Sequence, residues 1–353
     1  MKVNTFLSKT KIVFDSLVQK RVVIGNQSAD LDSIVSSISM AFYLTSKVHN
    51  SVPYVPIINS TKSLIKTKKE CMFLFDYLSI DIERDLVFIN EWKKDIDDVI
   101  LVDHNELDSK EKELEIEDKV SAIIDHHLDK KLFMNAEPRI VDTAVGSCST
   151  LIANLFFQSN IQLDASFAAM MMFPILSDTN NLTCRASEQD KQIAQHLNTI
   201  AKIDPKWLYL QIEKFKFDIS DEDLITLLNK DYKQYVTNSS SWGMSSVNFS
   251  VHEWIQKSKD DLIKVKKFMQ EKNLFFYAIL SCYKNLSEFK RDLILVGDKT
   301  LILNFEENMR DNVSSVEKNE YCGLNYILYD VDQVSFTRKY FQPELEKIIK
   351  MYI

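Results

Sequence analysis

Between Lys20 and about Ala201, short apolar runs alternate with longer segments whose apolar residues recur at helical spacing. The short runs predict buried strands over residues 21–25, 98–102 and 120–124. The longer segments predict helices over residues 34–44, 147–157 and 165–175. β-branched runs that alternate with helices are typical of a parallel sheet. The pattern therefore predicts an α/β fold, with a parallel sheet that carries helices on both faces.

The remainder of the chain has a different pattern. We take residues 204–218 as a linker between a first domain, residues 1–203, and a second domain, residues 219–353. In the second domain the pattern predicts a helix over 221–235 and a long charged helix between the first two of four strands. Those strands are predicted over 244–249, 274–283, 293–296 and 300–304. The sequence thus predicts a smaller α+β domain.

Composition limits the classes of protein to be considered. The 353 residues are 45% hydrophobic and 27% charged, which suits two globular domains. With 43 Lys and Arg against 51 Asp and Glu, the net charge of −8 disfavours a general nucleic-acid binder. The negative net charge still allows an anionic substrate, provided that a local patch of Lys and Arg outweighs it. We find neither an apolar run long enough for a membrane span nor a secretory signal. The five cysteines contain no Cys-x-x-Cys pair, so we expect a cytoplasmic protein with reduced thiols.

Polar, acid-containing clusters follow each of the three predicted strands in the first domain. They lie at residues 25–33, 102–105 and 124–127, and a fourth cluster at 176–181 follows an apolar helix. A single Asp at a helix start is more often a cap than a ligand. However, ligands of parallel sheets bind beyond the carboxyl ends of the strands. We therefore expect the four clusters to converge at one edge of the sheet.

So many carboxylates at one edge would repel one another unless cations neutralise them. Carboxylates with a minority of imidazoles and no thiolate favour Mn²⁺ or Mg²⁺. Two such ions close together stabilise both the attacking and the leaving oxygen of a phosphoryl transfer. Asp30 and Asp32, one residue apart, can face two different ions. The sequence thus predicts a site for two divalent cations.

These clusters resemble the four motifs of the DHH phosphoesterase superfamily, named after the sequence Asp125-His126-His127. Residues Lys230–Lys233, followed by Trp242–Val247, resemble the start of the DHH-associated carboxy-terminal domain. Thr337-Arg338-Lys339, followed by Pro343, resembles the basic substrate-binding motif of that domain. This pairing of domains is shared by family II inorganic pyrophosphatases, eukaryotic cytosolic exopolyphosphatases and prune-type proteins.

One position separates these groups. Family II pyrophosphatases begin the first motif with a metal-ligating histidine, whereas this chain has Asn26 there, as in the exopolyphosphatase and prune forms. The second motif, Asp103-His104-Asn105, also resembles the exopolyphosphatase form. Because an amide oxygen is a weaker ligand than imidazole, Asn26 shifts the expected preference from Mn²⁺ towards Mg²⁺. The resemblance favours an exopolyphosphatase. A pyrophosphatase or prune-like short-chain polyphosphatase or nucleotide phosphohydrolase is the alternative, and a non-catalytic binding protein stays open.

The resemblance also implies roles for individual residues. The implied ligands of two divalent cations, Mg²⁺ or Mn²⁺, are Asn26, Asp30, Asp32, Asp103, His126 and Asp178, with Asp103 bridging the ions. A hydroxide between the ions would attack the terminal phosphorus of inorganic polyphosphate in line and release orthophosphate. The implied catalytic residues are Asp103, His127, Arg338 and Lys339, and the implied substrate-binding residues are His127, Lys233, Arg338 and Lys339. A monomer is expected from the resemblance alone.

Several neighbouring residues have two interpretations. Asp125 is expected to orient a histidine, and His104 to do the same or to act as a nearby donor. Arg185 either orients a site carboxylate or is a surface residue. Ser147 and Ser149 either simply cap a helix or cap one whose amino terminus faces the substrate. The four lysines of Lys62–Lys69 form either a solvated surface or a rim that attracts phosphate.

Overall fold

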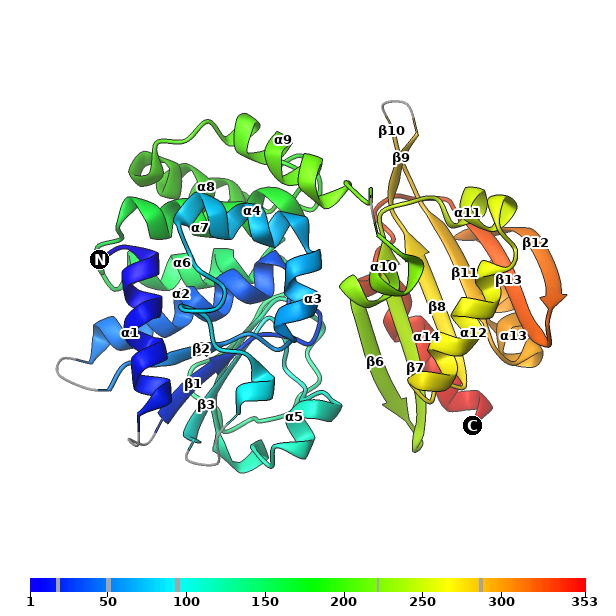
Figure 1. Cartoon of the computed structure of the whole chain (residues 1–353), viewed down its shortest axis with the longest axis horizontal. Helices are drawn as coiled ribbons and strands as arrows, with labels where there is room; N and C mark the ends of the chain where they lie inside the picture. Colours follow the sequence, from blue (N-terminus) through cyan, green and yellow to red (C-terminus); the bar gives the residue numbers. More distant parts are fainter. Residues whose placement is uncertain (17–19, 49–51, 93–95, 221, 286–287) are drawn as a thin grey trace. The chain divides into compact units, whose positions relative to one another are not determined.

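The computed structural model describes the chain except residues 17–19, 49–51, 93–95, 221 and 286–287. The chain divides into two compact units, Met1–Lys216 and Phe217–Ile353 (Figure 1). The segment expected as a linker contains helix α9 (Pro205–Lys216), which packs against α4 (Lys69–Leu78) and α7 (Ala165–Asp178) of the first unit. Among the described residues, no helix combines the length and the apolar character needed to cross a membrane.

The first unit is built on a five-stranded parallel sheet with the order β2-β1-β3-β4-β5. Its strands are β1 (Lys20–Ile24), β2 (Val55–Ile57), β3 (Ile96–Val102), β4 (Val120–Asp125) and β5 (Arg139–Val141). The predicted strands at β1, β3 and β4 are confirmed. The two edge strands were missed, because runs of three residues give no periodicity to detect.

Alternate residues of the strands face two separate apolar clusters. Val23, Ile100 and Ile124 pack in one cluster with residues of α2 (Leu31–Lys47), α6 (Cys148–Gln158) and α7. Val22, Val99 and Leu101 pack in the other with Phe14 and apolar residues of connecting segments. The remaining helices of the unit are α1 (Val3–Asp15), α3 (Lys62–Thr67), η1 (Ile89–Glu91), α5 (Ser109–Glu113), η2 (Glu117–Lys119) and α8 (Glu188–Ala201). The helices predicted at α2, α6 and α7 are confirmed.

The second unit contains a six-stranded mixed sheet with the order β12-β13-β11-β8-β7-β6. Its neighbouring strands are antiparallel except β7 and β8, which are parallel. The strands are β6 (Tyr232–Thr237), β7 (Ser240–Val247), β8 (Phe276–Ser281), β11 (Asp292–Val296), β12 (Val313–Tyr321) and β13 (Leu324–Val331), and a separate hairpin pairs β9 (Tyr283–Asn285) with β10 (Glu288–Lys290).

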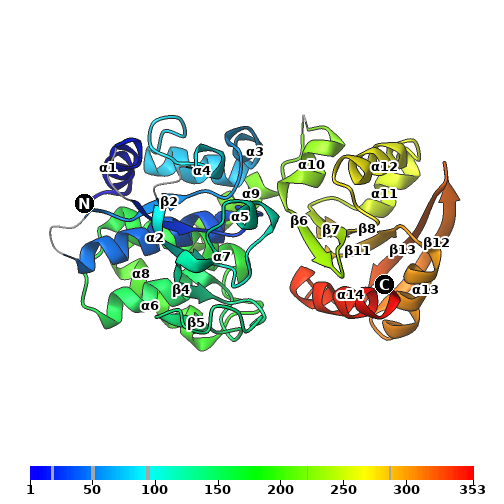
Figure 2. The same ribbon diagram turned by 90° about the horizontal axis from the view of Figure 1, so that it is seen from below.

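Helices cover both faces of this second sheet (Figure 2). Residues of α13 (Lys299–Asn308) and α14 (Arg338–Tyr352) pack on the face that carries Trp242 and Phe276. Residues of α10 (Leu224–Lys230), α11 (Val251–Lys257) and α12 (Asp261–Glu271) pack on the opposite face. The expected α+β architecture is therefore observed.

Three predictions in this unit were wrong. A helix was predicted over 221–235, of which residue 221 lies outside the described residues. Helix α10 ends at Lys230. Residues 232–237 instead form strand β6, whose backbone pairs with β7. The strand predicted over 300–304 lies within α13, because the Asp298 carboxylate accepts hydrogen bonds from the N–H groups of Thr300 and Leu301 and starts a helix. The long charged helix is two helices, α11 and α12, separated at Ser258, whose backbone leaves the helical conformation.

Candidate metal centre

The first polar cluster leaves β1 in a tight turn that leads directly into α2. A Cβ atom at position 25 would lie 2.1 Å from Ser33 Oγ and 2.8 Å from the Ser33 carbonyl oxygen, so only glycine permits this approach. Ala29 has a positive φ of 45° in this turn. The Asp30 carboxylate then caps α2 by accepting a hydrogen bond from Ser33 N–H at 3.0 Å. The cap stabilises the loop, which contains a backbone conformation that is unfavourable for alanine.

Asp103 follows β3 with a φ of 60°, and its N–H continues the sheet by donating to the Ile124 carbonyl at 3.0 Å. Its buried carboxylate receives a 2.5 Å hydrogen bond from Asn26 Nδ2. The Ser28 N–H donates to Asn26 Oδ1 at 2.9 Å. Because an N–H group only donates, the amide oxygen must face Ser28 and the amide nitrogen must face Asp103. In this arrangement Asn26 meets Asp103 as a hydrogen-bond donor.

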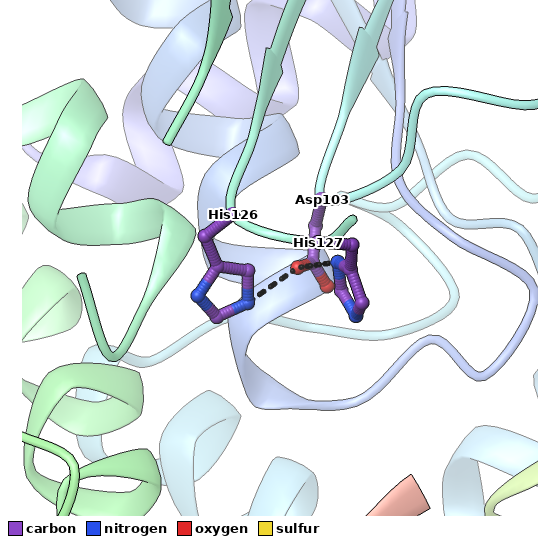
Figure 3. A group of neighbouring side chains, drawn as sticks. All are labelled: Asp103, His126 and His127. Carbon is purple, nitrogen blue, oxygen red and sulfur yellow. Dashed lines mark ion pairs between the residues drawn. The ribbon is translucent and has the colours of Figure 1, made fainter. Parts of the chain in front are cut away.

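The two histidines after β4 both point at the Asp103 carboxylate (Figure 3). His126 Nε2 lies 3.1 Å from Asp103 Oδ1, and His127 Nδ1 lies 3.6 Å from the same oxygen. His126 Nε2 is also 3.5 Å from Asp32 Oδ2. One ligand atom from each of Asp103, His126 and His127 lies within 4.8 Å of the other two. The residues of the second and third motifs therefore converge.

Asp125 holds the turn that carries these histidines. Its buried carboxylate accepts hydrogen bonds from His126 N–H at 2.7 Å, from His127 N–H at 3.1 Å and from His127 Nδ1 at 2.8 Å. Asn105 Nδ2 donates to its other oxygen at 2.5 Å. Burial by itself would raise the pKa of Asp125, but the adjacent His127 and these donors hold it well below its usual range. An ionised Asp125 thus orients the His127 ring.

Asp32 lies at the amino terminus of α6 as well as in the first turn of α2. Its Oδ1 accepts hydrogen bonds from Ser147 Oγ at 2.8 Å and from Ser149 N–H at 3.0 Å, and its Oδ2 accepts one from Cys148 N–H at 2.7 Å. The amino-terminal amides of α6 therefore point at this carboxylate and stabilise its charge. Ser147 also caps α6 by accepting a hydrogen bond from Ser149 N–H. Both serines of this segment thus bind Asp32.

Asp178, the last residue of α7, completes the acidic edge. Burial and the negative charge of Asp32 raise the pKa of Asp178 to about 7. This crowding of like charges is what a divalent cation would relieve. The carboxylates of Asp30 and Asp178 lie outside the compact group of Asp103 and the two histidines. Arg185 Nη2 donates to the backbone carbonyl of Asp178 at 3.1 Å, so it supports the end of α7.

His104 lies against α5. Its Nδ1 is 2.8 Å from the Val102 carbonyl oxygen and its Nε2 is 2.9 Å from Glu111 Oε1. Burial by itself would lower the pKa of His104, but the adjacent Glu111 raises it to about 9. We did not predict Glu111 as a partner, although its position three residues after Asp108, in a capping box, places it in the first turn of a helix.

Asp190 is a second residue that the sequence analysis missed. Its buried carboxylate accepts hydrogen bonds from Gly146 N–H at 2.9 Å and from Thr150 Oγ1 at 2.6 Å. A Cβ at Gly146 would lie 2.7 Å from the carbonyl oxygen of Arg185. Asp190 therefore fixes the start of α6 against the segment that follows Asp178. Its signal in the sequence is the capping box that it forms with Ser187.

The basic residues predicted to bind substrate lie in the second unit. Arg338 begins α14 and donates to the Asp231 carboxylate at 2.6 Å and to its carbonyl at 2.8 Å. Asp231 immediately precedes β6, the strand that carries the buried Lys233. Lys339 follows Arg338 in the first turn of α14 and is exposed. This end of α14 therefore combines basic side chains with helix amides and has no acidic residue in its first turn.

The residues of the first unit fit divalent cations. Carboxylate oxygens of Asp32 and Asp103 both lie near His126 Nε2, and no thiol belongs to the compact group. Oxygen and imidazole ligands without thiolate suit Mg²⁺ and Mn²⁺. The Asp178 carboxylate lies within electrostatic reach of those of Asp32 and Asp30. The structure thus offers a candidate centre in which positive charge would offset several carboxylates.

Two family models match the chain. Residues 20–175 match the amino-terminal domain of the DHH family, and residues 210–348 match the DHHA2 domain. The chain is 31% identical over 298 residues to a Schizosaccharomyces pombe protein provisionally named an exopolyphosphatase. That match covers 77% of this chain and 75% of the relative. It is 27% identical over 273 residues to the manganese-dependent inorganic pyrophosphatase of Bacillus subtilis, covering 74% of this chain and 82% of the relative.

A third relative is rat exopolyphosphatase PRUNE1, which is 28% identical over 254 residues. That match covers 67% of this chain and 54% of the relative, so the chain spans about half of that longer protein. A solved Methanococcus jannaschii structure, provisionally described as a family II inorganic pyrophosphatase, superposes with a TM-score of 0.68 at 23% identity. The match covers 93% of this chain and 99% of that one, which shows a shared fold.

Proposed function

The chain belongs to the DHH phosphoesterase family with a DHHA2 domain, and on this premise we propose that it is a metal-dependent exopolyphosphatase. It would release orthophosphate from the end of inorganic polyphosphate. The observation that carries the proposal is the Asp103 carboxylate, held by Asn26 and faced by His126 and His127 at the carboxyl edge of the parallel sheet.

Asn26, by which the first motif resembles the exopolyphosphatase form, is the reason to prefer an exopolyphosphatase to a pyrophosphatase, and it also bears on the choice of metal. A histidine at this position would bring a further imidazole to the Asp103 carboxylate. Asn26 instead donates its amide hydrogen to Asp103, and its oxygen is bonded to Ser28. The centre is therefore poorer in nitrogen ligands, which favours Mg²⁺ relative to Mn²⁺. We propose Asn26 as a residue that orients the Asp103 carboxylate, which would be a ligand of the cations.

The cations would be held by Asp30, Asp32, Asp103, His126 and Asp178. Bound there, they would lower the pKa of water and offset the charge of phosphate oxygens. The protein's own contribution is to fix the carboxylates before substrate arrives: the amides of α6 hold Asp32, and Asn26 holds Asp103. Prearranged charges of this kind need no reorganisation during the reaction.

His127, Lys233, Arg338 and Lys339 are proposed to bind the phosphate chain. Because His127 Nδ1 is hydrogen-bonded to Asp125, Nε2 is the ring atom with which His127 would donate to a phosphate oxygen. The Asp231 carboxylate accepts a hydrogen bond from Arg338 and thereby holds the Arg338 guanidinium at the start of α14. Guanidinium binds phosphate through parallel hydrogen bonds, and the helix amides add to its attraction for anions.

The test is phosphate release by the purified chain with Mg²⁺ or Mn²⁺, on long-chain polyphosphate, tripolyphosphate and pyrophosphate in parallel. Asp103→Asn serves as the inactive variant, and Asp118→Asn, an exposed aspartate of the same unit, serves as the matched control. We expect the long chain to be shortened with pyrophosphate left over. Activity limited to pyrophosphate would replace the proposal with a pyrophosphatase. Metal binding without hydrolysis of any of the three would leave a binding protein.

A further inference from the structure

The structure separates the four lysines of Lys62–Lys69 into different roles. Lys62 and Lys66 form ion pairs with Glu83 at 2.8 and 2.7 Å on the protein surface. Lys68, by contrast, is only 2% exposed. Its ammonium donates a hydrogen bond to the carbonyl oxygen of Ser28, in the loop between β1 and α2. A buried lysine thus reaches from the helices α3 and α4 into the loop of the first motif.

The backbone of Lys68 is fixed at the junction of these two helices. Its N–H donates to the Ile65 carbonyl at 3.0 Å, and its own carbonyl accepts hydrogen bonds from Cys71 N–H at 2.9 Å and Met72 N–H at 3.0 Å. The side chain therefore starts from a rigid point. Burying an ammonium group has a large desolvation cost, which its surroundings must offset. The buried thiol of Cys71 lies within electrostatic reach of both Lys68 and Asp30, so the lysine shares a region with one of the acidic residues.

The hydrogen-bond acceptor explains what the lysine does. The Ser28 carbonyl belongs to the peptide group that joins Ser28 to Ala29, and Ala29 has a φ of 45°. Rotation of this peptide group would change the φ of Ala29. A residue with a Cβ reaches the left-handed region only at a cost, so other interactions must hold it there. A hydrogen bond from Lys68 to this oxygen does so directly.

Ser28 connects the same peptide to the candidate metal centre. Its N–H and Oγ donate to Asn26 Oδ1 at 2.9 and 2.6 Å, and its Oγ lies 3.3 Å from Asp30 Oδ2. Asn26 in turn donates to Asp103. Loss of the left-handed turn would therefore displace a donor to Asp103 and a neighbour of Asp30.

We infer that Lys68 is a positioning residue of the metal centre: its buried ammonium holds the left-handed turn at Ala29 and thereby fixes Asn26 and Asp30. The inference rests on the proposed function for the identity of the centre, but it concerns metal affinity and not the substrate. It assigns to Lys68 a role in which the lysine touches neither metal nor phosphate.

The test is Mn²⁺ affinity, measured by calorimetric titration of the whole chain, for Lys68→Met, Lys68→Arg and Lys66→Met. Residues that orient metal ligands typically change metal affinity by about 10–100-fold, so Lys68→Met is expected to weaken Mn²⁺ binding by that factor. Lys68→Arg keeps a cationic donor and should restore most of the affinity. Lys66→Met, the same change in a lysine paired with Glu83, should leave it unchanged.

A double variant separates this role from ordinary packing. Glycine adopts positive φ without the penalty of a Cβ, so Ala29→Gly removes the strain that Lys68 is inferred to oppose. The Mn²⁺ affinity of Ala29→Gly/Lys68→Met should therefore exceed that of Lys68→Met alone. If Lys68 merely filled space, Ala29→Gly would not rescue it. If Lys68→Met by itself folds poorly, the Mn²⁺ affinity of the double variant can still be compared with that of the wild type.

The outcomes distinguish this inference from the proposed function. Unchanged Mn²⁺ affinity in folded Lys68→Met, or no rescue by Ala29→Gly, overturns the inference whatever the activity. Wild-type protein that binds Mn²⁺ but hydrolyses no polyphosphate overturns the proposed function, whereas the affinity ratios would still support the role of Lys68. Absence of Mn²⁺ binding by the wild type would overturn both.

Discussion

Asp32 and Arg338 each lie in the first turn of a helix, but the surroundings of the two charges are opposite. Asp32 is buried and accepts hydrogen bonds from the amino terminus of α6, so the helix dipole stabilises its negative charge. Arg338 places a positive charge at the amino terminus of its own helix, where the Asp231 carboxylate pairs with it and the exposed Lys339 lies next to it. The first arrangement is an anionic site and the candidate centre for cations. The second brings a guanidinium held by Asp231, an exposed lysine and helix amides together, where we propose that phosphate binds.

The largest expected effect comes from breaking the first arrangement at Asp103. Asp103→Asn replaces the carboxylate that faces both histidines by a neutral amide, so metal binding and charge stabilisation are lost together. We expect kcat for polyphosphate to fall on the order of 10³-fold or more. Phosphate release at saturating metal measures this, with circular dichroism to verify the fold. Activity within tenfold of the Asp118→Asn control would contradict the assignment of the centre.

The second arrangement is tested by Arg338→Ala. Removing a charge-assisted contact to phosphate should lower kcat/KM by about 10–100-fold. Mn²⁺ affinity should stay at the wild-type value, since the candidate ligands lie in the first unit. Lys347→Ala, an exposed lysine farther along α14, is the matched control and should behave as wild type. A loss of Mn²⁺ affinity in Arg338→Ala equal to the loss of activity would show that the two arrangements are not separate.

Crowding of carboxylates makes the stability of the metal-free protein depend on pH. The pKa of Asp178 is raised to about 7 from an ordinary 3.8, so the folded state binds its proton more tightly than the unfolded state. The resulting stabilisation is complete below pH 3.8 and is lost as the pH rises through 7. Because Asp178 is partly exposed, we expect a contribution on the order of 2 kcal/mol.

Urea unfolding in EDTA at pH 5 and pH 8 measures this contribution. The decrease in unfolding free energy between the two pH values should be smaller in Asp178→Asn than in wild type, because the variant cannot ionise at this position. Added Mn²⁺ should restore stability to the wild type at pH 8. An equal decrease in both proteins would show that Asp178 is not the group that titrates.

The smallest effect is expected from changing the type of ligand at position 26. Asn26→His would place an imidazole beside Asp103, and imidazole favours Mn²⁺ over Mg²⁺. The ratio of Mn²⁺ to Mg²⁺ affinity should increase by roughly tenfold or less, since one contact changes among several. Competition titrations measure the ratio. A ratio that stays the same or decreases would show that position 26 does not control the choice of metal.

The sequence was sufficient to predict the part of the fold that carries the centre. β1, β3 and β4 each contain an uninterrupted run of three or four buried apolar residues, and their parallel order brings the residues that follow them to one edge. The convergence of Asp103 with His126 and His127 follows from that rule. In the second unit, residues 232–237 and 300–304 have patterns compatible with either helix or strand, and backbone pairing and capping decided between them.

The interactions that fix the centre could not be predicted in the same way. The pairing of Asp32 with the amino terminus of α6 joins residues more than a hundred positions apart, and no local pattern records it. The same is true of Lys68 and Ser28, which are forty positions apart. Glu111 and Asp190 each stand at the third position of a capping box, a pattern that is common at helix starts and does not indicate a partner elsewhere in the chain. Local periodicity predicts where a side chain points, whereas long-range partners depend on how the elements pack.

The most direct test of the central claim is the number of Mn²⁺ ions bound by the chain. Two divalent cations are proposed at the carboxyl edge of the first sheet, where Asp30, Asp32, Asp103, His126 and Asp178 would hold them. Calorimetric titration, checked by elemental analysis after dialysis, should give about two ions per chain for the wild type and for Arg338→Ala. Asp103→Asn should lose both sites or bind far more weakly. A wild type that binds no Mn²⁺, or an Asp103→Asn variant with wild-type stoichiometry and affinity, would contradict the account.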